Sequence, residues 1–188
     1  MTVTLSNGGG TFQDSVNVYT AGVGIDITDN VISRIGCDLS IGDIYAGGII
    51  FYLDASGCHG LVCATTDQST SIYWYNLSYT NTTAFASSVG GGDGNTSMIV
   101  YNQGTGSYAA KLCYDLSLNG YSDWYLPSKY ELNLMYLQKA SIGGFATDYY
   151  WSSTEYSNSN AWILRLSNGA QSDANKFNSK GVRAVRAF

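Results

Sequence analysis

Hydrophobic and polar residues follow three different patterns along the chain. Residues 1–36 contain short β-prone pieces, cut by glycines and an Asp-Asn turn, which read VTL, SVNVYT, GIDIT and NVIS. A segment of this length cannot bury a core alone, so we expect it to pack against the remaining chain or against copies of itself. The pattern predicts a β-rich stem over residues 1–36 and a main domain over residues 37–188.

Strand and loop patterns fill the first half of the main domain. The runs AGGIIFYLD and HGLVCATT are β-rich and are joined by ASGC, which predicts a hairpin within residues 46–66. SIYWYNL, at residues 71–77, is a candidate third strand. Residues 78–106 are rich in Gly, Thr, Asn and Ser, and they predict long loops of the kind that often carry function.

Two helices are expected next, because the hydrophobic period changes. In SYAAKLCYDLSL, apolar residues fall at the i, i+3, i+4 and i+7 positions of one helical face, namely Ala109, Leu112, Cys113 and Leu116. In LPSKYELNLMYLQK, Ser128 stands three residues before Glu131, which is the spacing of a capping box. The second helix is therefore predicted to begin directly after Ser128.

Strand patterns return in the C-terminal part as YYWSS, AWILRLS and GVRAVRAF. In AWILRLS, the period-2 geometry places Trp162, Leu164 and Leu166 on one face, and Ile163 and Arg165 on the other. We expect the first face to pack in the core and the second to be exposed to solvent. Around and after this strand lies a tract rich in Asn and Ser, residues 156–181.

Composition limits the partners. Only 12% of residues are charged and the net charge is -5, so no basic surface for nucleic acid or anionic lipid is expected. No apolar run reaches 18 residues, and MTVTLSNGGG lacks the features of a signal peptide, so we expect neither membrane insertion nor a secretion signal in this chain. With 22 Gly and 16 Tyr, the chain is typical of a turn-rich β or α+β protein whose tyrosines form core or contact surface.

The cysteines and the single histidine offer little chemistry. Cys37, Cys58, Cys63 and Cys113 are irregularly spaced, which favours reduced packing cysteines in a cytosol, with a Cys58–Cys63 pair left open. His59 lies at the expected hairpin turn, where a surface histidine is the favoured interpretation over a catalytic one. No second Cys or His cluster stands at zinc-ligand spacing, so no metal site and no cofactor are expected.

Other candidate motifs have structural interpretations. VGGGDGNTS lacks the lysine of a phosphate-binding loop and is predicted to be a flexible turn. Asp123, Glu131 and Glu155 lie near aromatic residues, which leaves paired carboxylates for glycoside hydrolysis open, although Glu131 already has a capping role. Arg183 and Arg186 alternate with Val and Ala, so we expect them to pair with Asp123 or Glu155 and stabilise the fold.

An ordered series of motifs resembles a known group of domains. GGIIFYLD, NGYSDWYLPSKYEL, YYWSSTEY, AW and VRAVRAF are similar to motifs of the C-type-lectin-fold variable proteins of diversity-generating retroelements, and of the related C-terminal domain of collagen-like bacterial adhesins. The resemblance covers residues 41–188. It implies an α+β domain of C-type lectin-like fold, with two helices and a twisted antiparallel sheet, after a short β-rich segment. YTAGVGIDITDNVIS is similar, more loosely, to short β segments of trimeric phage tail fibres.

In such retroelements, reverse transcription randomises adenines, and Asn codons ending in a pyrimidine never yield Trp, Met, Gln, Lys or Glu. Trp151, Glu155, Trp162, Gln171, Lys176 and Lys180 therefore lie outside the reachable alphabet and are expected to be fixed. Ala174 lies within it. The resemblance implies a variable region at about 156–181, with ligand-binding residues Tyr156, Ser157, Asn158, Ser159, Asn160, Ile163, Arg165, Ser167, Asn168, Ala170, Ser172, Asp173, Asn175, Phe177 and Asn178. An ordinary polar loop region is the alternative, because Asn and Ser favour turns.

The function that this implies is binding without catalysis. We expect a phage receptor-binding or tail-tip protein on a virion, or else an adhesin or lectin at a bacterial cell surface, which recognises a surface protein or glycan. A homotrimer is expected if the stem self-associates. Calcium-dependent sugar binding of the familiar lectin type is disfavoured, because the only proline is Pro127 in LPS. An enzyme related to formylglycine-generating oxidases ranks last, because their reactive cysteine pair does not map onto these cysteines.

Overall fold

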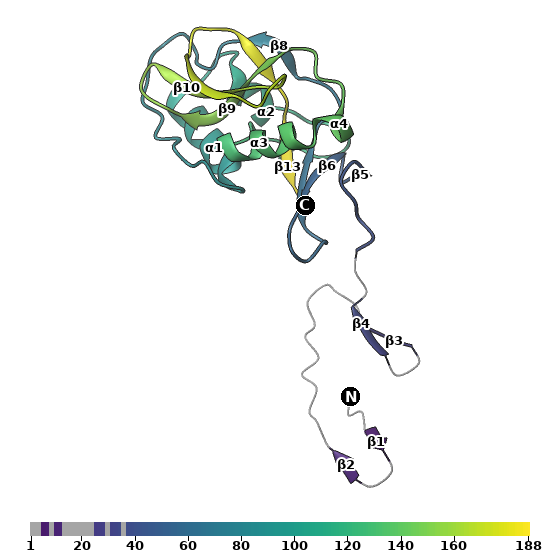
Figure 1. The fold of residues 1–188 in the computed structure, drawn as a ribbon. Coiled ribbons are helices and arrows are strands. Elements are labelled where there is room, and N and C mark those ends of the chain that lie inside the picture. Colours follow the sequence, from purple (N-terminus) through teal and green to yellow (C-terminus); the bar gives the residue numbers. More distant parts are fainter. Residues whose placement is uncertain (1–4, 8–9, 13–24, 29–30, 35–36) are drawn as a thin grey trace. The chain divides into compact units, whose positions relative to one another are not determined.

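A computed structural model of the chain describes residues 5–7, 10–12, 25–28, 31–34 and 37–188. The chain divides into two compact units, Met1–Cys37 and Asp38–Phe188. In the first unit, two antiparallel strand pairs are described (Figure 1), which are β1 (Leu5–Asn7) with β2 (Gly10–Phe12), and β3 (Ile25–Thr28) with β4 (Val31–Arg34). The strands expected in GIDIT and NVIS are thus present as β3 and β4, whereas the one expected at residues 15–20 lies outside the described residues.

The second unit contains two β-sheets. The four-stranded sheet has the order β13-β7-β6-β5, with β5 (Ile44–Tyr45), β6 (Gly48–Leu53), β7 (Gly60–Cys63) and β13 (Val185–Ala187). The five-stranded sheet has the order β11-β10-β9-β12-β8, with β8 (Ser69–Ile72), β9 (Tyr149–Glu155), β10 (Asn160–Arg165), β11 (Gln171–Asn175) and β12 (Lys180–Val182). The expected hairpin is β6–β7, which pairs antiparallel.

Two features of the sheets differ from the expectation. The C-terminal run GVRAVRAF forms two short strands, β12 and β13, which belong to different sheets. In addition, β12 pairs in parallel with β9, so the five-stranded sheet is mixed rather than wholly antiparallel. The polar tract also contributes an edge strand, β11, which its Asn-rich and Ser-rich sequence does not predict.

Four helices are described, which are α1 (Gly91–Gln103), α2 (Ala109–Tyr114), α3 (Lys129–Leu137) and α4 (Lys139–Ile142). The two expected helices correspond to α2 and α3. The capping box of α3 is formed in both directions, because the Ser128 hydroxyl accepts from the Glu131 N–H at 3.3 Å and Glu131 Oε2 accepts from the Ser128 N–H at 2.7 Å. Together with the two sheets, these helices confirm an α+β fold.

Helix α1 corrects the prediction of long loops over residues 78–106 and of a flexible turn at VGGGDGNTS. Its first turn is poor in helix formers, and contacts with neighbouring segments hold it. A Cβ on Gly92 would lie 2.3 Å from Glu131 Oε2 and 2.8 Å from the Leu126 carbonyl oxygen, so only glycine allows this approach. Asn95 donates to the Ala86 carbonyl at 2.7 Å and accepts from the Ala86 N–H at 3.1 Å. Tertiary contacts therefore override a weak local propensity.

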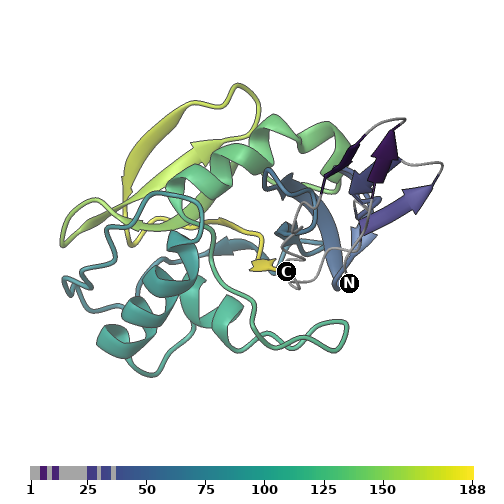
Figure 2. The same cartoon turned by 90° about the horizontal axis from the view of Figure 1, so that it is seen from below.

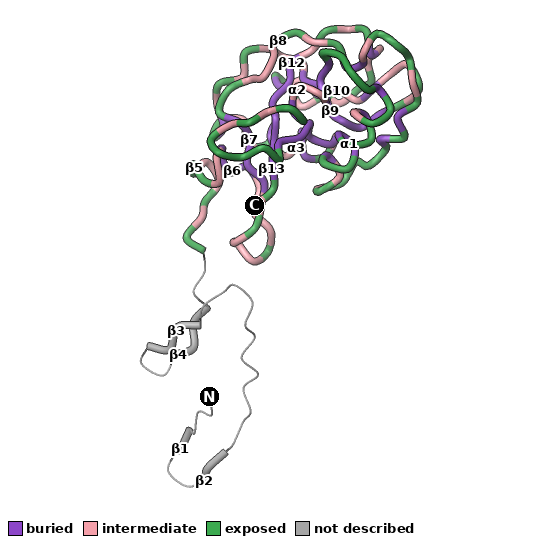
Figure 3. Tube along the Cα trace, turned by 180° about the vertical axis from the view of Figure 1, so that it is seen from behind, coloured by how far each residue is buried: buried purple, intermediate pink, exposed green. Residues whose placement is uncertain are grey.

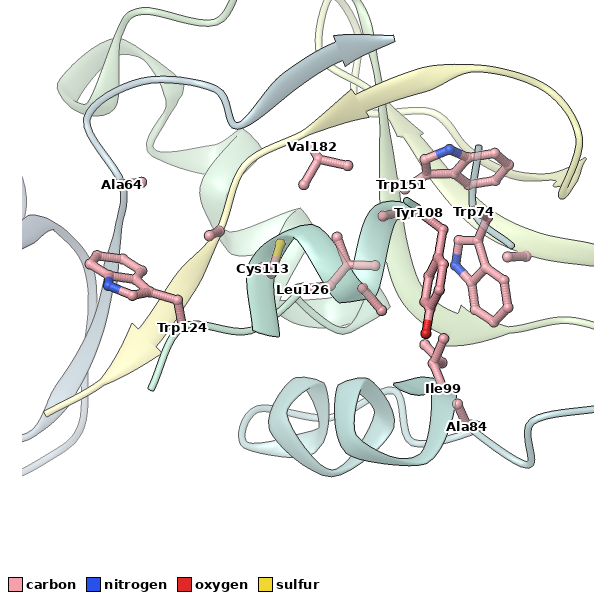
Figure 4. Close-up of a cluster of buried hydrophobic side chains, with 14 of the residues drawn as sticks. Ala64, Trp74, Ala84, Ile99, Tyr108, Cys113, Trp124, Leu126, Trp151 and Val182 are labelled. Atoms are coloured by element: carbon pink, nitrogen blue, oxygen red, sulfur yellow. The ribbon is translucent and has the colours of Figure 1, made fainter. Parts of the chain in front are cut away.

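Two hydrophobic clusters pack on opposite faces of strand β10. The first gathers Trp74, Trp124, Trp151 and Ile163 with buried residues of α1 and α2, and Figure 4 shows Trp124 lying apart from the other labelled tryptophans. The second joins Leu132 and Met135 of α3 to residues of β6, β7, β9, β10 and β13, and Figure 2 shows the β10–β11 hairpin in yellow-green beside the green α3. Buried segments therefore run through both sheets, as Figure 3 shows in purple.

None of the helices described in residues 37–188 combines the length and the apolar character needed to cross a lipid bilayer. This finding concerns the described residues alone.

Candidate binding surface

The β10–β11 hairpin separates the candidate site residues into two groups. Its register pairs Asn160 with Asn175 and Leu164 with Gln171. The β9–β10 turn therefore lies next to the β11–β12 turn at one end, which we call the Tyr156 end (residues 156–160 and 173–178). The β10–β11 turn, with Arg165, forms the Ser167 end (residues 165–170). Strand geometry puts roughly 20 Å between Asn160 and Ser167.

Hydrogen bonds fix the course of both turns at the Tyr156 end. The N–H groups of Tyr156 and Ser157 both donate to the Asn160 carbonyl oxygen at 3.0 Å, and the Asn160 N–H donates to the Ser157 hydroxyl at 3.1 Å. The Lys176 N–H donates to the Ser159 carbonyl oxygen at 2.8 Å, which joins one turn to the other. Most of these bonds are between main-chain groups, so the backbone of this end depends little on which side chains it carries.

A buried ion pair supports this end from beneath. The side chains of Glu155 and Lys176 contact each other and have no exposed surface. Lys176 Nζ also donates to the carbonyl oxygens of Asn158 at 2.8 Å and Thr80 at 3.2 Å, and it lies 4.5 Å from the centroid of the Trp74 ring. Burial lowers the pKa of Lys176, an effect that the hydrogen bond and the charge of Glu155 oppose.

Glu155 ties a third loop to the same place. Its carboxylate accepts from the N–H of Thr82 at 2.9 Å and from the N–H of Thr83 at 3.0 Å. The Glu155 N–H donates to the Ala84 carbonyl oxygen at 2.7 Å, which adds a main-chain contact to the same loop. The Glu155–Lys176 pair therefore joins residues 80–84 to both turns of the Tyr156 end. The same hydrogen bonds provide partners for the two buried charges.

Most side chains at the Tyr156 end, Lys176 aside, are exposed or partly exposed. Tyr156 is 53% exposed and Phe177 is 54% exposed, so both rings are open to a partner at this end. Polar groups of the end are linked to one another: Asn160 Nδ2 donates to Asp173 Oδ2 at 2.6 Å, and the hydroxyl of Tyr79 donates to Asn175 Oδ1 at 2.6 Å. This end thus displays aromatic anchors among amide, hydroxyl and carboxylate groups.

Trp162 lies at the surface of the α3 side of the hairpin rather than deep in the core. Leu164 and Leu166 are buried, as expected for their face, but Trp162 is only partly buried. The ammonium of Lys129 lies 3.2 Å from its ring centroid, and Tyr156 packs edge-on at 5.4 Å. The face that holds Trp162 therefore reaches from the core to the Tyr156 end.

The burial of Ile163 contradicts its predicted place in the binding site. We expected its side chain on display, but it is 5% exposed and belongs to the first hydrophobic cluster. Ile163 pairs with Trp151 on β9, and Trp74 and Trp151 of the same cluster are fully buried. Both faces of β10 are covered here, so the period-2 pattern cannot show which face meets solvent.

The Ser167 end has a different support. Arg165 Nε donates to Asp148 Oδ2 at 2.6 Å, with 43% and 36% of the two side chains exposed. The Ser167 N–H donates to Asp148 Oδ1 at 2.8 Å. The hydrogen bond from Arg165 lowers the pKa of Asp148. The remaining candidates at this end, Asn168 and Ala170, are exposed, as is Ser172 in the middle of β11.

The other candidate motifs have structural partners. His59 is exposed in the β6–β7 turn, where the sequence predicted a surface histidine. Arg186 pairs with Asp123 at 2.7 Å, as expected, whereas Arg183 pairs with Asp67 at 2.6 Å rather than with Glu155. Among the described residues, no group of three or more His, Cys, Asp or Glu side chains could hold a metal ion.

The cysteines correct part of the sequence interpretation. Cys63 and Cys113 are free and buried, so Cys58 and Cys63 do not pair. Burial raises the pKa of the Cys63 thiol to about 12, and it also raises the pKa of Cys113. These two are reduced packing cysteines, as expected. Cys37 and Cys58 each take part in a disulfide, contrary to the expectation that all four are reduced.

Comparisons with known proteins identify a family and a structural neighbour. Residues 63–186, well over half of the chain, match the family model of the Lcl C-terminal domain. No curated protein sequence matches the chain. The chain is similar to a fimbrial protein from Bacteroides ovatus, with 16% identity and a TM-score of 0.49; the likeness covers 88% of this chain and 48% of the fimbrial protein, or about half its length.

Proposed function

The chain belongs to the Lcl C-terminal domain family, and we propose that it is a non-catalytic, adhesin-like binding protein whose contact surface is the Tyr156 end. One observation carries the proposal: exposed Tyr156 and Phe177 stand on a backbone that the buried Glu155–Lys176 pair fixes from below. Aromatic anchors surrounded by Asn, Ser and Asp are the composition of antibody loops, which bind by the same division of labour. The partner is a surface protein or glycan.

We propose further that a diversity-generating retroelement varies this surface, within a C-type lectin-like fold. Three of the six residues outside the reachable alphabet occupy buried supporting positions: Trp151 is fully buried, and Glu155 and Lys176 form the buried pair. The candidate ligand-binding residues are exposed or partly exposed, with Ile163 as the buried exception. Exchange of the exposed side chains would leave the buried pair and the main-chain bonds of the turns in place.

A bacterial cell surface is the setting that we favour. Disulfide-bonded cysteines, here Cys37 and Cys58, are typical of proteins that mature in oxidising compartments. Membership of the Lcl C-terminal domain family supports the same setting. A phage receptor-binding or tail-tip protein on a virion is the second candidate, because residues 19–33 resemble segments of trimeric tail fibres. Both settings use the same contact surface.

Trimerisation through the N-terminal unit would strengthen weak binding. Three copies of the Tyr156 end acting together raise the avidity by about 100-fold or more without any new contact. Light scattering on the chain lacking residues 1–36 tests this part of the proposal. We expect monomers from the shortened chain and trimers from the full chain, and trimers from both would show that residues 1–36 are not the trimerisation segment.

Mutation of the two ends tests the binding surface. We expect replacement of Tyr156 and Phe177 together by Ala to weaken binding to cells by roughly tenfold or more, because exposed aromatic anchors dominate such contacts. The melting temperature should change little, since the edge-on contact of Tyr156 with Trp162 is worth about 1 kcal/mol. The control replaces Ser167 and Asn168, which are exposed at the other end. Flow cytometry over a panel of bacterial and animal cells measures binding, and equal losses in both variants would contradict the proposal.

The history of the gene tests the diversification. We expect variation among related copies of the gene to fall on exposed positions of residues 156–181 and to spare Glu155, Trp162 and Lys176. We also expect an adenine-bearing near-copy of this coding segment beside a reverse transcriptase gene. Variation spread evenly over the chain, without such a neighbour, would refute a retroelement origin while leaving the binding surface itself to the cell-binding experiment.

A further inference from the structure

A pocket of about 360 Å³ opens at the start of helix α3, on the α3 side of the β10–β11 hairpin. It is lined by Ser87, Lys129, Tyr130, Asn133 and Gln171. The volume lies at the lower end of the range of ligand pockets, roughly 300–1,000 Å³. Lys129 connects the pocket to the surface described above, because its ammonium lies over the ring of Trp162.

Hydrogen bonds between three separate segments hold the walls of the pocket. The Tyr130 N–H donates to the Ser87 carbonyl oxygen at 3.0 Å, and the Ser128 hydroxyl donates to the Ser88 carbonyl oxygen at 2.8 Å. Gln171 Nε2, from the edge strand β11, donates to the Lys129 carbonyl oxygen at 3.3 Å. The loop at 87–88, the first turn of α3 and the edge strand are therefore joined, and a ligand would not have to order them on binding.

The pocket brings together polar groups that the chain itself does not use. Within the described residues, the side chains of Ser87, Tyr130 and Asn133 make no hydrogen bond to other parts of the protein, and Gln171 uses only its amide nitrogen. Hydroxyl and amide groups both donate and accept. The ring of Tyr130 is half exposed and offers an apolar face beside them, since Tyr130 is 51% exposed. None of the residues described in the lining is acidic.

We propose that this pocket is a binding site for a neutral saccharide. A sugar ring presents hydroxyls that both donate and accept hydrogen bonds, and it has an apolar face of C–H groups that packs on an aromatic ring. The pocket lining offers hydroxyl and amide groups for the first and the Tyr130 ring for the second. An anion such as sulfate would need several cations, whereas the pocket has one, Lys129, whose ammonium lies over Trp162. A wholly apolar ligand would leave the amides and hydroxyls unpaired.

The saccharide site is distinct from the Tyr156 end and does not depend on it. Ser87, Lys129, Tyr130 and Asn133 precede the proposed variable region, and Gln171 lies outside the reachable alphabet. The pocket would therefore keep its specificity while the neighbouring surface changes. The protein would then have a constant glycan site, the pocket, beside a variable contact surface, the Tyr156 end. Mutations in one of them should leave binding at the other unchanged.

Saturation-transfer NMR and calorimetry on the full chain test the site, with the methyl glycosides of glucose, galactose, mannose and N-acetylglucosamine as probes. We expect at least one glycoside to bind with a millimolar dissociation constant. Tyr130→Ala and Asn133→Ala should each weaken that binding by roughly tenfold or more, as loss of a stacking or hydrogen-bonding partner predicts. Both side chains reach the surface, so folding should be retained. Tyr101→Ala is the matched control, because Tyr101 is 84% exposed on α1 and does not line the pocket.

Three results would overturn the saccharide site. The first is the absence of binding by all four glycosides at millimolar concentration. The second is binding that survives both Tyr130→Ala and Asn133→Ala. The third is binding that is lost when Tyr156 and Phe177 are replaced and kept when Tyr130 is replaced, which would move the sugar to the Tyr156 end. Cell binding through the Tyr156 end is measured separately, so failure of either proposal leaves the other standing.

Discussion

The two ends of the β10–β11 hairpin carry similar polar side chains on different supports. At the Tyr156 end, the support is Glu155 with Lys176, a fully buried pair that also bonds to the loop at residues 80–84 and to the β9–β10 turn. At the Ser167 end, the ion pair is Arg165 with Asp148, and both side chains are more than a third exposed; Lys139 Nζ adds a hydrogen bond to the Leu166 carbonyl oxygen at 2.7 Å. The buried pair consists of residues outside the reachable alphabet, whereas Arg165 lies inside it. A binding surface tolerates side-chain substitution best where the residues that hold its backbone in place are not themselves substituted.

Removal of Lys176 should have the largest effect, because it leaves the Glu155 carboxylate buried without its counter-charge. We expect Lys176→Ala to destabilise the protein by about 3–5 kcal/mol, the usual cost of breaking a buried pair from one side. Urea unfolding, followed by tryptophan fluorescence, gives the free energy of unfolding. The Tyr156 end should also lose its cell binding, since Lys176 holds the carbonyl groups of both Asn158 and Thr80.

The matched control for Lys176 removes both charges at once. Lys176→Met combined with Glu155→Gln leaves no buried charge, and we expect it to recover much of the lost stability. A double variant as unstable as Lys176→Ala would show that packing, rather than the unpaired charge, sets the cost.

Ile163 lies between the two ends and should behave as a core residue. We expect Ile163→Ala to cost about 2–5 kcal/mol, because the side chain is 5% exposed and leaves a cavity beside Trp151. Phe177→Ala is the matched surface change, and its effect should stay within about 0.5 kcal/mol. Thermal or urea unfolding separates the two. Equal and small effects would restore the outward orientation that the sequence suggested for Ile163.

Replacement of Trp162 should destabilise the protein less than expected for such a large side chain, because Trp162 is only partly buried. We expect Trp162→Ala to cost about 2 kcal/mol, from the lost packing of Lys129 and Tyr156 on the ring. Trp151→Ala, at a fully buried tryptophan, should cost about 3–5 kcal/mol in the same assay. If the two tryptophans cost the same, Trp162 belongs to the core and the contact surface ends before it.

Local chemistry made part of the fold predictable from sequence. Helix α3 was predictable because Ser128 and Glu131 satisfy the first N–H groups of the helix between them. Helix α1 was not, because Gly92 and Asn95 serve contacts with residues that are distant in sequence or lie in the preceding loop. The edge strand β11 was hidden for a similar reason, since its pairing with β10 alone makes a strand of QSDAN.

The exposure of most candidate site residues was predictable, but their arrangement was not. The Asn-rich tract indicated which residues are displayed, and Tyr156 and Phe177 are indeed exposed. Which face of β10 meets solvent could not be predicted, because Ile163 belongs to a cluster that also contains Trp74, from a distant segment with no pattern linking it to β10. The Glu155–Lys176 pair could not be predicted either, because two charged residues in sequence carry no sign of burial.

Changes at the exposed Arg165–Asp148 pair should have the smallest effect on stability. Because this effect depends on charge, it should vary with pH and with salt. The hydrogen bond from Arg165 lowers the folded pKa of Asp148 below its unfolded value of 3.8. The stability contributed by Asp148 is therefore complete above pH 3.8 and is lost as the pH falls through the folded pKa. We expect Arg165→Ala to cost less than Trp162→Ala at neutral pH, and we expect the difference from wild type to vanish in strong acid.

Salt distinguishes the two pairs most directly. At about 1 M salt the screening length falls to about 3 Å, so an exposed pair loses most of its attraction while a buried pair keeps it. Urea unfolding at low and high salt should show the effect of Arg165→Ala disappearing and that of Lys176→Ala persisting. If both effects disappear, the Glu155–Lys176 pair is open to water. The Tyr156 end would then have no more protected a support than the Ser167 end, and the physical reason for placing the contact surface there would be gone.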